Sequence, residues 1–514
     1  MTTDWKNIDI NDQFKHALKL MNETAEHIFI TGKAGTGKST LLSLFIGQTE
    51  KPIAVLAPTG VAALNVKGET IHSFFKFFPN ITLEEAGKKG RQQRKNELYK
   101  NLRTIVIDEI SMVRADLMDC VDMFLQMAKG IPKPFGGVQM IFIGDLYQLP
   151  PVLIGKEKPH FEKIYESPWF FHSAVFQNNF FSMKFVELEK IYRQKDNAFI
   201  DLLNAIRTNT VDASHIQTIN RRLTAEKDKD AIQLTSTNDR ASEINQARLS
   251  ELKSISRSFH CLTRGSFDIK QFPTEETLIL KVGSQVMFVN NDTSGRWVNG
   301  TIGQVVKLEN ETISVKINNS ATVEVGMHTW NLYKYYFDVA SRSLGQEAVG
   351  SFTQIPVRLA WAITIHKSQG KTFDRVQIDL GRGSFASGQT YVALSRCRTF
   401  EGITLYKPIK PSDIRLDFRV QKFLTGFQYA ISEKALPLNK KINIIEDAIR
   451  QKLTLEIVYL KAKDVKSKRK IKPNYVGKLD YEGKPFLGVE AWCDLRKDTR
   501  VFRVDRILEI KMID

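Results

Sequence analysis

The segment from Gly32 to Ser39 limits the folds open to this chain more than any other. It reads Gly-Lys-Ala-Gly-Thr-Gly-Lys-Ser, follows the apolar run Ile28–Ile30 and precedes a stretch of helical character. A strand, a glycine-rich loop and a helix in this order present consecutive backbone N–H groups, at the positive end of the helix, to a chain of phosphates. Lys38 would reach the β- and γ-phosphates, and Ser39 would ligate Mg²⁺. The segment therefore predicts a nucleoside triphosphate site within a parallel α/β domain.

A second segment supplies the carboxylates that hydrolysis of the triphosphate requires. Thr104–Ile107 is a β-branched, mostly apolar run typical of a buried parallel strand, and Asp108 and Glu109 follow it directly. Because the carboxyl ends of parallel strands share one edge of a sheet, both side chains are expected beside the phosphate loop. Asp108 is suited to hold the Mg²⁺ shell, and Glu109 to polarise the attacking water. The pattern predicts an ATPase core.

The charge of the chain favours a polyanionic partner. Its 514 residues include 74 Lys and Arg against 57 Asp and Glu, a formal net charge of +17. No run approaches the ~20 apolar residues of a membrane-spanning helix, and the first residues lack a signal-peptide core. The four cysteines have no metal-ligand spacing and are interpreted as reduced, structural thiols. A cytoplasmic, nucleoid-associated location without a membrane partner is expected.

Changes of pattern along the chain predict two α/β domains, each with an insert. Residues 1–185 alternate apolar runs with helical stretches and carry a small insert at about 65–103, which includes a basic, polar stretch from Lys88 to Arg103. Residues 186–432 form a second α/β unit. It is interrupted at about 275–345 by short alternating strands with glycine and asparagine turns. Such strands are the signature of a small β-barrel.

Further polar segments in the first domain follow strand-like runs. Gln148, in Gly-Asp-Leu-Tyr-Gln-Leu-Pro-Pro, can sense a γ-phosphate by hydrogen bonding without adding charge. The turn Pro58-Thr59-Gly60 exposes backbone amides, while His72 and Phe74 offer polar and aromatic groups to a phosphate backbone and a base. Each segment alone could be an ordinary βα loop. Together they favour a nucleic-acid path beside the nucleotide.

The second domain presents two arginines and a polar loop after apolar runs. Arg193 lies in Ile-Tyr-Arg-Gln and Arg396 in Ala-Leu-Ser-Arg, and arginine is suited to clamp the charge that develops on a transferring phosphoryl group. Thr364, His366 and Lys367 place hydroxyl, imidazole and ammonium groups close together. The pattern indicates one half that binds nucleotide and another that supplies arginine fingers.

The order of these segments resembles that of a superfamily-1B DNA helicase. From Gln13 to about Arg398 the chain carries GKAGTGKST, APTGVAA, TIHSFF, VIDEISM, GDLYQLPPV, IYRQ, AITIHKSQGKTFD and YVALSRCR. The segment Pro134–Gln139 resembles the signature of the petite-integration-frequency (Pif) family within that group. The resemblance implies an α/β fold with two RecA-like parallel-sheet domains, a wedge insert in the first and an SH3-like β-barrel in the second.

The resemblance also implies the role of each matching residue, with Gln13 reading adenine and ATP and Mg²⁺ as the cofactors. Catalysis is assigned to Lys38, Asp108, Glu109, Gln148, Arg193 and Arg396. The nucleotide is expected on Gln13, Gly32, Gly35, Thr36, Gly37, Lys38, Ser39, Thr40 and Gly370, and the metal on Ser39 and Asp108. Single-stranded DNA is expected on Pro58, Thr59, Gly60, His72, Phe74, Thr364, His366 and Lys367.

The expected activity is ATP-dependent unwinding of DNA, and movement 5′-to-3′ is implied by the resemblance alone. Expected partners are single-stranded DNA and tailed duplexes, with RNA–DNA hybrids and G-quadruplexes as further candidates, for a monomer that serves DNA repair, replication or telomere maintenance. A RecD-like motor subunit is one alternative, opposed by Pro134–Gln139 and by the lack of an acidic nuclease cluster. A nucleotide-switched DNA-binding regulator is another, and it would hydrolyse ATP without unwinding.

The end of the chain predicts a separate module. Residues 433–441 are interpreted as a linker, and residues 442–514 resemble a WYL domain, another SH3-like barrel, through Ala491–Arg496 and Thr499–Ile507. Where the Trp-Tyr-Leu of that family is expected, the chain has Phe486–Val489 instead. The basic residues Arg496, Arg500, Arg503 and the run Lys466–Lys472 favour nucleic acid as the ligand. A structural appendage that stabilises the motor is the alternative.

Overall fold

The computed structural model describes residues 10–153, 155, 157–194, 196–224, 231–265, 272–317, 322–461, 464–481 and 483–513. Contacts divide the chain into two units, and apart from residues 207–210 the boundary falls between Arg415 and Leu416. Within the described part, no helix has both the length and the apolar character needed to cross a membrane.

The first unit contains a six-stranded sheet in which all paired strands are parallel, with the order β3-β2-β4-β5-β1-β6. Its central strands are apolar runs buried along most of their length, as expected for a sheet covered on both faces. The strands are β1 (His27–Gly32), β2 (Ile53–Ala57), β3 (Glu69–Thr70), β4 (Thr104–Ile107), β5 (Gln139–Ile143) and β6 (Met183–Leu188).

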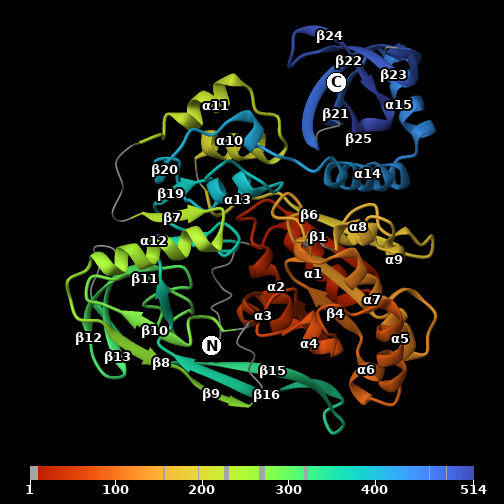
Figure 1. Ribbon diagram of the computed structural model, residues 1–514. Helices are drawn as coiled ribbons and strands as arrows, with labels where there is room; N and C mark the ends of the chain where they lie inside the picture. Colours follow the sequence, from red (N-terminus) through yellow and green to blue (C-terminus); the bar gives the residue numbers. More distant parts are fainter. Residues whose placement is uncertain are drawn as a thin grey trace. The chain divides into compact units, whose positions relative to one another are not determined.

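Helices connect these strands and cover the sheet (Figure 1). Phe14 and Leu41, from the first two helices, share one core with Ile30, Val106 and Ile141 of the strands. The helices are α1 (Asp12–Glu23), α2 (Lys38–Gln48), α3 (Gly60–Asn65), α4 (Ile71–Phe75), α5 (Leu83–Gln92), α6 (Glu97–Asn101), α7 (Ala115–Lys129), α8 (Lys158–Phe161) and α9 (Ala174–Gln177), with 3₁₀ turns η2 (Ile110–Met112), η3 (Pro134–Gly137) and η4 (Phe170–His172). Because β1 and α2 both contribute to this core, the junction between them, where the phosphate loop lies, is held in place.

The insert predicted at residues 65–103 contributes both to the sheet and to its helical cover. Strand β3 joins the sheet edge beside β2. Helix α5 starts with a capping box, in which the side chains of Thr82 and Glu85 bond each other's backbone N–H groups. It packs against α7, with α6 also beside α7 (Figure 1). The insert is therefore anchored on the first domain.

A second parallel sheet, with the order β18-β7-β19-β20, follows in the same unit. Its strands come from distant parts of the chain, because the inserted strands separate β7 from β18. The elements are β7 (Ile232–Thr235), β18 (Ala362–Thr364), β19 (Val376–Asp379) and β20 (Ile403–Leu405), with helices α10 (Asn197–Arg207), α11 (Ala213–Asn220), α12 (Asn238–Glu251) and α13 (Gln389–Ser395).

The inserted antiparallel region is wider than the predicted 275–345, since its strands run from Arg257 to Leu359. Strand β8 pairs with β10, and β17 pairs with β11, so residues outside the predicted limits close the sheets. Phe259 and Val357 accordingly lie in one core with Val286. The strands are β8 (Arg257–His260), β9 (Leu262–Gly265), β10 (Thr277–Leu280), β11 (Gln285–Phe288), β12 (Ile302–Leu308), β13 (Thr312–Ile317), β14 (Thr322–Gly326), β15 (His328–Asp338), β16 (Ser343–Gln354) and β17 (Val357–Leu359).

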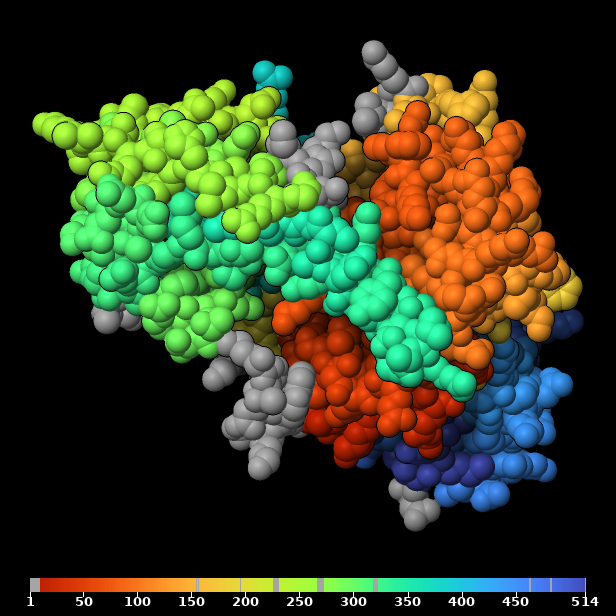
Figure 2. Space-filling model, turned by 90° about the horizontal axis from the view of Figure 1, so that it is seen from below, coloured from red at the N-terminus to blue at the C-terminus, as the bar shows by residue number. Residues whose placement is uncertain are grey.

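The long β15–β16 hairpin of this region reaches the first sheet. The Tyr335 N–H donates to Glu69 Oε1 at 2.7 Å, and the Val55 N–H donates to Tyr335 Oη at 2.9 Å. Figure 2 shows the hairpin, in green to teal, lying across the red and orange surface of the first domain. Strand β3 is too short to pair with all of β2. The hairpin therefore provides a hydrogen-bond acceptor for the Val55 N–H of β2, which β3 does not reach.

The second unit is a five-stranded antiparallel sheet, β24-β23-β22-β21-β25, with two helices. Its own core joins Ile445 of α15 to Leu455, Val489 and Ile507 of the strands. The elements are α14 (Phe418–Ala435), α15 (Leu438–Gln451), β21 (Thr454–Lys461), β22 (Val465–Tyr481), β23 (Lys484–Cys493), β24 (Asp498–Arg503), η7 (Val504–Arg506) and β25 (Ile507–Ile513).

The predicted linker at residues 433–441 is mostly helical. Helix α14 ends at Ala435 and α15 begins at Leu438, with Pro437 capping the new helix. The Lys441 ammonium is buried and donates to Ser432 Oγ at 2.9 Å, and the same hydroxyl donates to Leu508 O at 2.9 Å. Pro437, which suggested a linker, instead marks the start of α15, and Lys441 makes a buried hydrogen bond. Because Ser432 of α14 bonds both Lys441 of α15 and Leu508 of β25, α14 belongs to the second unit.

This boundary predicts where the chain can be cut. A chain that ends at Arg415 should keep the first unit folded, with a melting temperature within about 3 °C of that unit in the full chain. A chain that ends at Lys440 should expose the apolar face of α14, including Val420 and Leu424, which are buried in the full chain. Thermal unfolding with an apolar dye checks this. If the longer chain binds no more dye than the shorter one, α14 does not need the rest of the second unit to cover its apolar face.

Candidate functional site

The phosphate loop has the predicted strand–loop–helix geometry. Strand β1 ends at Gly32 and α2 begins at Lys38, while Gly35 and Gly37 adopt left-handed φ angles of 82° and 85°. A Cβ at Gly35 would lie 2.4 Å from the Cβ of Arg193, so only glycine allows the loop to touch that segment. The Tyr192 N–H also donates to Gly35 O at 2.9 Å. The Ile-Tyr-Arg-Gln segment therefore lies directly on the phosphate loop.

Lys38 occupies the concave side of this loop. Its ammonium donates to Gly32 O at 2.7 Å and to Lys33 O at 3.0 Å. The buried Thr36 side chain donates to Lys33 O at 3.0 Å and holds the turn. Ser39 and Thr40 follow Lys38 in the first turn of α2, and Ser39 is exposed. A triphosphate would thus meet an ammonium, two hydroxyls and the positive helix end.

The predicted carboxylate pair lies at the carboxyl end of β4. Burial, and then the charge of Glu109, raise the pKa of Asp108 to about 7. Burial also raises the pKa of Glu109, while Lys38 and Arg396 oppose that rise. Gln369 Nε2, which follows β18 of the second sheet, donates to Glu109 Oε2 at 3.2 Å. The pair carries crowded negative charge that a cation would neutralise.

These residues fit a bound Mg²⁺ ion. Mg²⁺ is usually held by one or two carboxylates, water and substrate phosphates, and Asp108 and Ser39 supply the protein share of such a shell. Across the described ranges, no cluster of three or more His, Cys, Asp or Glu residues could hold a metal by itself. A metal at Asp108 would therefore depend on the triphosphate for further ligands.

The two predicted arginine fingers come together beside this site. Arg396 is only 1% exposed, and it donates from Nε to Val392 O at 2.9 Å and from Nη2 to Ser395 Oγ at 2.8 Å. Burial, and then the charge of Arg193, lower the pKa of Arg396 to about 9. Burial also lowers the pKa of Arg193. Gln194 Nε2 donates to Cys397 O at 3.1 Å, which ties the two arginine segments together.

The other predicted nucleotide residues surround the loop. Gln13 Oε1 accepts from the Glu189 N–H at 2.9 Å, which fixes the side chain assigned to adenine. A side chain at Gly37 would meet the ring of Phe14, so α1 lies against the loop. Gln148 is buried, and its Nε2 makes a long 3.4 Å contact with Asp145 Oδ2. Gly370 has a left-handed φ of 77° with open space around it.

Sequence reasoning missed Tyr391 in the arginine segment. Its hydroxyl accepts from the Ala34 N–H of the phosphate loop at 3.0 Å and donates to Asp145 Oδ2 at 3.3 Å. Tyr391 is buried on α13, a helix of the domain that contains the second parallel sheet. A phenol within an apolar helix was the available signal, because a buried hydroxyl needs a partner.

Most predicted DNA contacts lie at strand ends, as expected. Thr59 caps α3 by accepting from the Ala62 N–H at 3.3 Å, between Pro58 and Gly60. Thr364 is 4% exposed and accepts from the Lys367 N–H at 3.3 Å, which makes it a turn-forming residue. Lys367 itself is exposed. Thr364 therefore shapes the loop that presents Lys367.

His366 forms a stacked pair that the sequence did not reveal. Its ring lies parallel to that of Phe385, with centroids 6.4 Å apart and an interplanar angle of 15°, and Phe385 is 58% exposed. An exposed aromatic face of this kind suits the stacking of a base. The position of Phe385 in a Gly-Ser loop before α13 was the one signal in the sequence.

Phe74 does not have the exposed position that base stacking requires. It is 3% exposed, and its ring lies edge-on to those of Phe75, Tyr99 and Tyr335. His72, on the same short helix, is half-buried. The exposed aromatic of the insert is Phe78, at 66%, with the Lys89 ammonium 4.9 Å from its ring centre.

Comparison with known proteins gives two family matches. Residues 9–217 match the PIF1-like helicase family, and residues 440–512 match the WYL domain. The chain is 34% identical to the human ATP-dependent DNA helicase PIF1 over 77% of its own length and 61% of the human protein. It is 32% identical to the ATP-dependent DNA helicase Pif1 of Bdellovibrio bacteriovorus, over 82% of this chain and 93% of that one. The chain thus spans less than two thirds of the human relative and nearly all of the bacterial one.

Solved structures of a Bacteroides Pif1 resemble this fold. The crystal structure with ADP-AlF4 is 34% identical, with a TM-score of 0.74 over 82% of this chain and 98% of that one. The structure of the same protein with ADP-AlF3 and single-stranded DNA has equal identity and coverage but a TM-score of 0.59. The two structures of the relative therefore differ in how closely they match this chain.

The raised pKa of Asp108 predicts a pH-dependent stability in the absence of nucleotide and Mg²⁺. Because its pKa rises from 3.8 to about 7 on folding, ionisation opposes folding and the free energy of unfolding should fall over that range. Asp108→Asn should remove the part of this fall that Asp108 contributes, while Glu109, whose pKa is also raised, keeps its own. The substitution should stabilise the chain at higher pH by on the order of 2 kcal/mol, less than the full shift because the side chain is partly exposed.

Denaturant unfolding between acidic and mildly alkaline pH measures this difference. Asp239→Asn, at an exposed position in the first turn of α12, is the matched control and should follow the wild type. Parallel profiles for wild type and Asp108→Asn would show that Asp108 is not held in a charge-crowded site.

Proposed function

Because the chain belongs to the PIF1-like helicase family, we propose that it is an ATP-driven DNA helicase that moves 5′-to-3′ on a single strand. The observation that carries this proposal is a pair of hydrogen bonds between the second sheet and the nucleotide site of the first. Tyr391 bonds the phosphate loop at Ala34, and Gln369 bonds the carboxylate of Glu109. One nucleotide can thereby be sensed by both sheets.

ATP would be held by the residues around the phosphate loop. Lys38 would exchange its two carbonyl contacts for the β- and γ-phosphates, and Gln13 would select the base. Bound Mg²⁺ would supply charge neutralisation of the phosphates, with Ser39 and Asp108 as its protein ligands. Glu109 would orient and polarise the attacking water, and its raised pKa would fall as cationic charge enters.

Arg396 provides a physical route between hydrolysis and DNA. Its Nη1 lies 3.4 Å from Ser368 O and 3.3 Å from Lys371 O, within the loop that presents His366 and Lys367. A γ-phosphate that attracts this guanidinium would compete with those carbonyls and pull on the loop. Because Gln369 of the same loop bonds Glu109, hydrolysis and DNA grip would change together.

The strand would run over the loops at the carboxyl ends of both sheets. Thr59, His72 and Lys367 would contact its phosphates, and the stacked His366 and Phe385 rings would support a base. Phe78 of the insert is exposed, with the Lys89 ammonium over one face of its ring. It is our candidate for the side chain that separates the two strands of the duplex. The Bacteroides relative was solved with single-stranded DNA, which supports this class of partner.

The WYL unit would aid nucleic-acid binding or couple the motor to its track. Arg496 and the 40% exposed Trp492 lie near one end of β23. Arg500 and Arg503 form exposed ion pairs with Asp498 and Asp505, and such weak pairs leave both arginines able to turn to a phosphate. Tailed duplexes are the proposed substrate, with RNA–DNA hybrids and G-quadruplexes as further candidates, for a protein that acts as a monomer.

Strand separation on duplexes with a 5′ tail, a 3′ tail or no tail tests the proposal. Only the 5′-tailed duplex should be unwound, and only with ATP and Mg²⁺. Lys38→Ala serves as the inactive control, and Lys163→Ala, at an exposed site in the same domain, as the active one. ATP hydrolysis without strand separation would favour the nucleotide-switched regulator, and unwinding from a 3′ tail would contradict the polarity.

Arg396→Lys should separate transition-state stabilisation from ATP binding. Lysine retains a positive charge in the buried position but lacks the planar donor fork, so kcat for DNA-stimulated hydrolysis should fall on the order of 10²- to 10³-fold. The KM for ATP should stay within about threefold of wild type. Steady-state kinetics at saturating single-stranded DNA measure both. A raised KM with unchanged kcat would make Arg396 a ground-state binding residue.

A further inference from the structure

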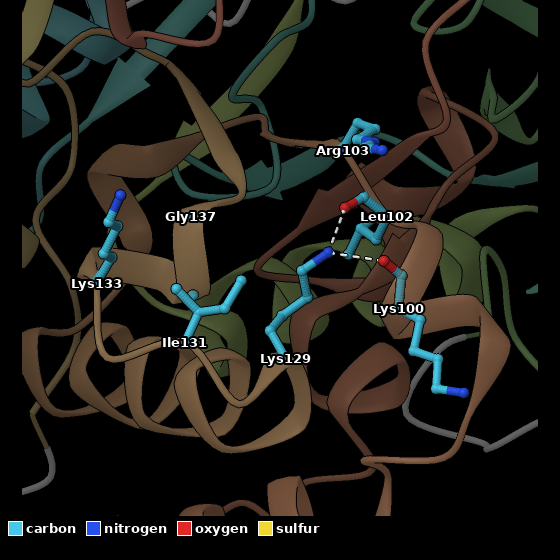
Figure 3. Close-up of a pocket in the computed structure, with 8 residues that line it drawn as sticks. Lys100, Leu102, Arg103, Lys129, Ile131, Lys133 and Gly137 are labelled. Carbon is cyan, nitrogen blue, oxygen red and sulfur yellow. Dashed lines mark hydrogen bonds between the residues drawn. The ribbon is translucent and has the colours of Figure 1, made fainter.

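A basic pocket of about 430 Å³ lies on the first domain (Figure 3). Four cationic residues contribute to its lining, and no carboxylate does. The lining residues are Lys100, Leu102, Arg103, Lys129, Ile131, Lys133, Gly136 and Gly137. Such an excess of one charge around a hollow favours an anionic ligand.

The pocket opens at the amino ends of the parallel strands. Arg103 directly precedes β4, and Gly137 lies two residues before β5. Asp108 and Glu109 follow the other end of β4, so Arg103 and Asp108 are separated by about 16 Å of extended chain. The pocket is therefore separate from the ATP site and from the loops proposed to hold the tracking strand.

The wall of the pocket is built by Lys129 in the last turn of α7. Its ammonium donates to Lys100 O at 2.9 Å and to Leu102 O at 3.0 Å, the two bonds drawn in Figure 3. These bonds join α7 to the end of α6. Burial, and then the charge of Arg103, lower the pKa of Lys129. The positive charges of Lys129 and Arg103 thus repel each other here, and a bound anion would reduce that repulsion.

The signature segment Pro134–Gln139 forms another side of the pocket. Its two glycines have different roles, because a Cβ at Gly136 would lie 2.6 Å from Leu125 O, whereas one at Gly137 would meet nothing within 4 Å. Packing on α7 requires glycine at 136. Gly137 has a left-handed φ of 76° and leaves the backbone open to a ligand. Lys133, just before this segment, is another of the lining residues drawn in Figure 3.

We propose that this pocket binds backbone phosphates of a nucleic-acid segment other than the tracking strand, such as the duplex ahead of it. The proposal rests on the proposed function, since it requires a DNA substrate. Pockets for small organic ligands are mostly apolar, but only Leu102 and Ile131 provide apolar side chains here, and no aromatic ring lines the pocket to stack a base. Arg103 and Lys133 are the side chains expected to meet phosphate.

The double variant Arg103→Ala/Lys133→Ala tests the pocket, because both residues lie outside the catalytic and tracking-strand sites. Lys19→Ala/Lys163→Ala, which removes two charges from exposed positions, is the matched control. Fluorescence anisotropy would measure binding to a forked duplex and to a short oligothymidine at several salt concentrations. ATP hydrolysis stimulated by the oligothymidine would be measured in parallel.

The pocket variant should bind the fork on the order of tenfold more weakly at about 0.1 M salt, with a log–log salt slope less steep by about 0.9 for each lost contact. Its binding to oligothymidine and its ATP hydrolysis should match wild type, and the control should match wild type throughout. Unchanged fork binding, with normal hydrolysis, would overturn the pocket alone. An equal loss on oligothymidine would overturn it by placing both residues on the tracking strand.

Inorganic pyrophosphate distinguishes a free phosphate ligand from a nucleic acid. With the ATP site filled by MgADP, pyrophosphate should raise the melting temperature of wild type but not of the pocket variant. Loss of this shift without loss of fork affinity would overturn the nucleic-acid assignment in favour of a free phosphate. A wild type that shows no DNA-stimulated hydrolysis would instead overturn the proposed function.

Discussion

The charge that is buried where the two parallel sheets meet constrains the rest of the first unit. Asp108 and Glu109 lie at the end of one sheet, and Arg396 is fully buried among groups of the other. Burying charge is costly unless it is paired or hydrogen-bonded. Gln369 bonds Glu109, and backbone carbonyls accept from Arg396, so the charges of Glu109 and Arg396 are partly satisfied by groups of the second domain. A triphosphate with its metal would complete this arrangement.

The same charges support the proposed coupling between the nucleotide and the loop that carries Lys367. The guanidinium of Arg396 has weak, long contacts to Ser368 and Lys371 and short ones to Val392 and Ser395. Loss of the long contacts would cost little and would free the loop that carries Lys367. A γ-phosphate offers a stronger, charge-assisted alternative. In the proposed mechanism, the nucleotide would therefore move the loop that carries Lys367 without any unfolding of the sheets.

The sequence was sufficient where the position of a segment depends on local spacing. The phosphate loop, the carboxylate pair and the arginine segments could be predicted because a few consecutive residues fix both their geometry and their chemistry. Phe74 could not be placed correctly, since only tertiary packing decides which ring of an aromatic run is buried with Tyr99 and Tyr335. The stacking of His366 on Phe385 was equally hidden, because it joins residues from different turns.

Domain limits were less predictable than motifs for a related reason. The inserted sheets extend from Arg257 to Leu359 because β8 pairs with β10 and β17 pairs with β11. Pairing between strands that are distant in the chain is not visible in the sequence pattern. Pro437 and Lys441 resembled linker residues, yet one caps α15 and the other makes a buried hydrogen bond. Polar composition alone does not distinguish an exposed connection from a helix whose charge is satisfied within the fold.

The distance between the two parallel sheets tests most directly whether they share one nucleotide. Spin labels at Glu50→Cys and Asp239→Cys, both exposed, would report it by pulsed electron resonance. Cys261, the one cysteine that is not buried, would be replaced by serine. With MgADP, aluminium fluoride and oligothymidine, the distance distribution should shift and narrow, and Lys38→Ala should abolish the change. An identical distribution with and without these ligands would contradict a site completed by both sheets.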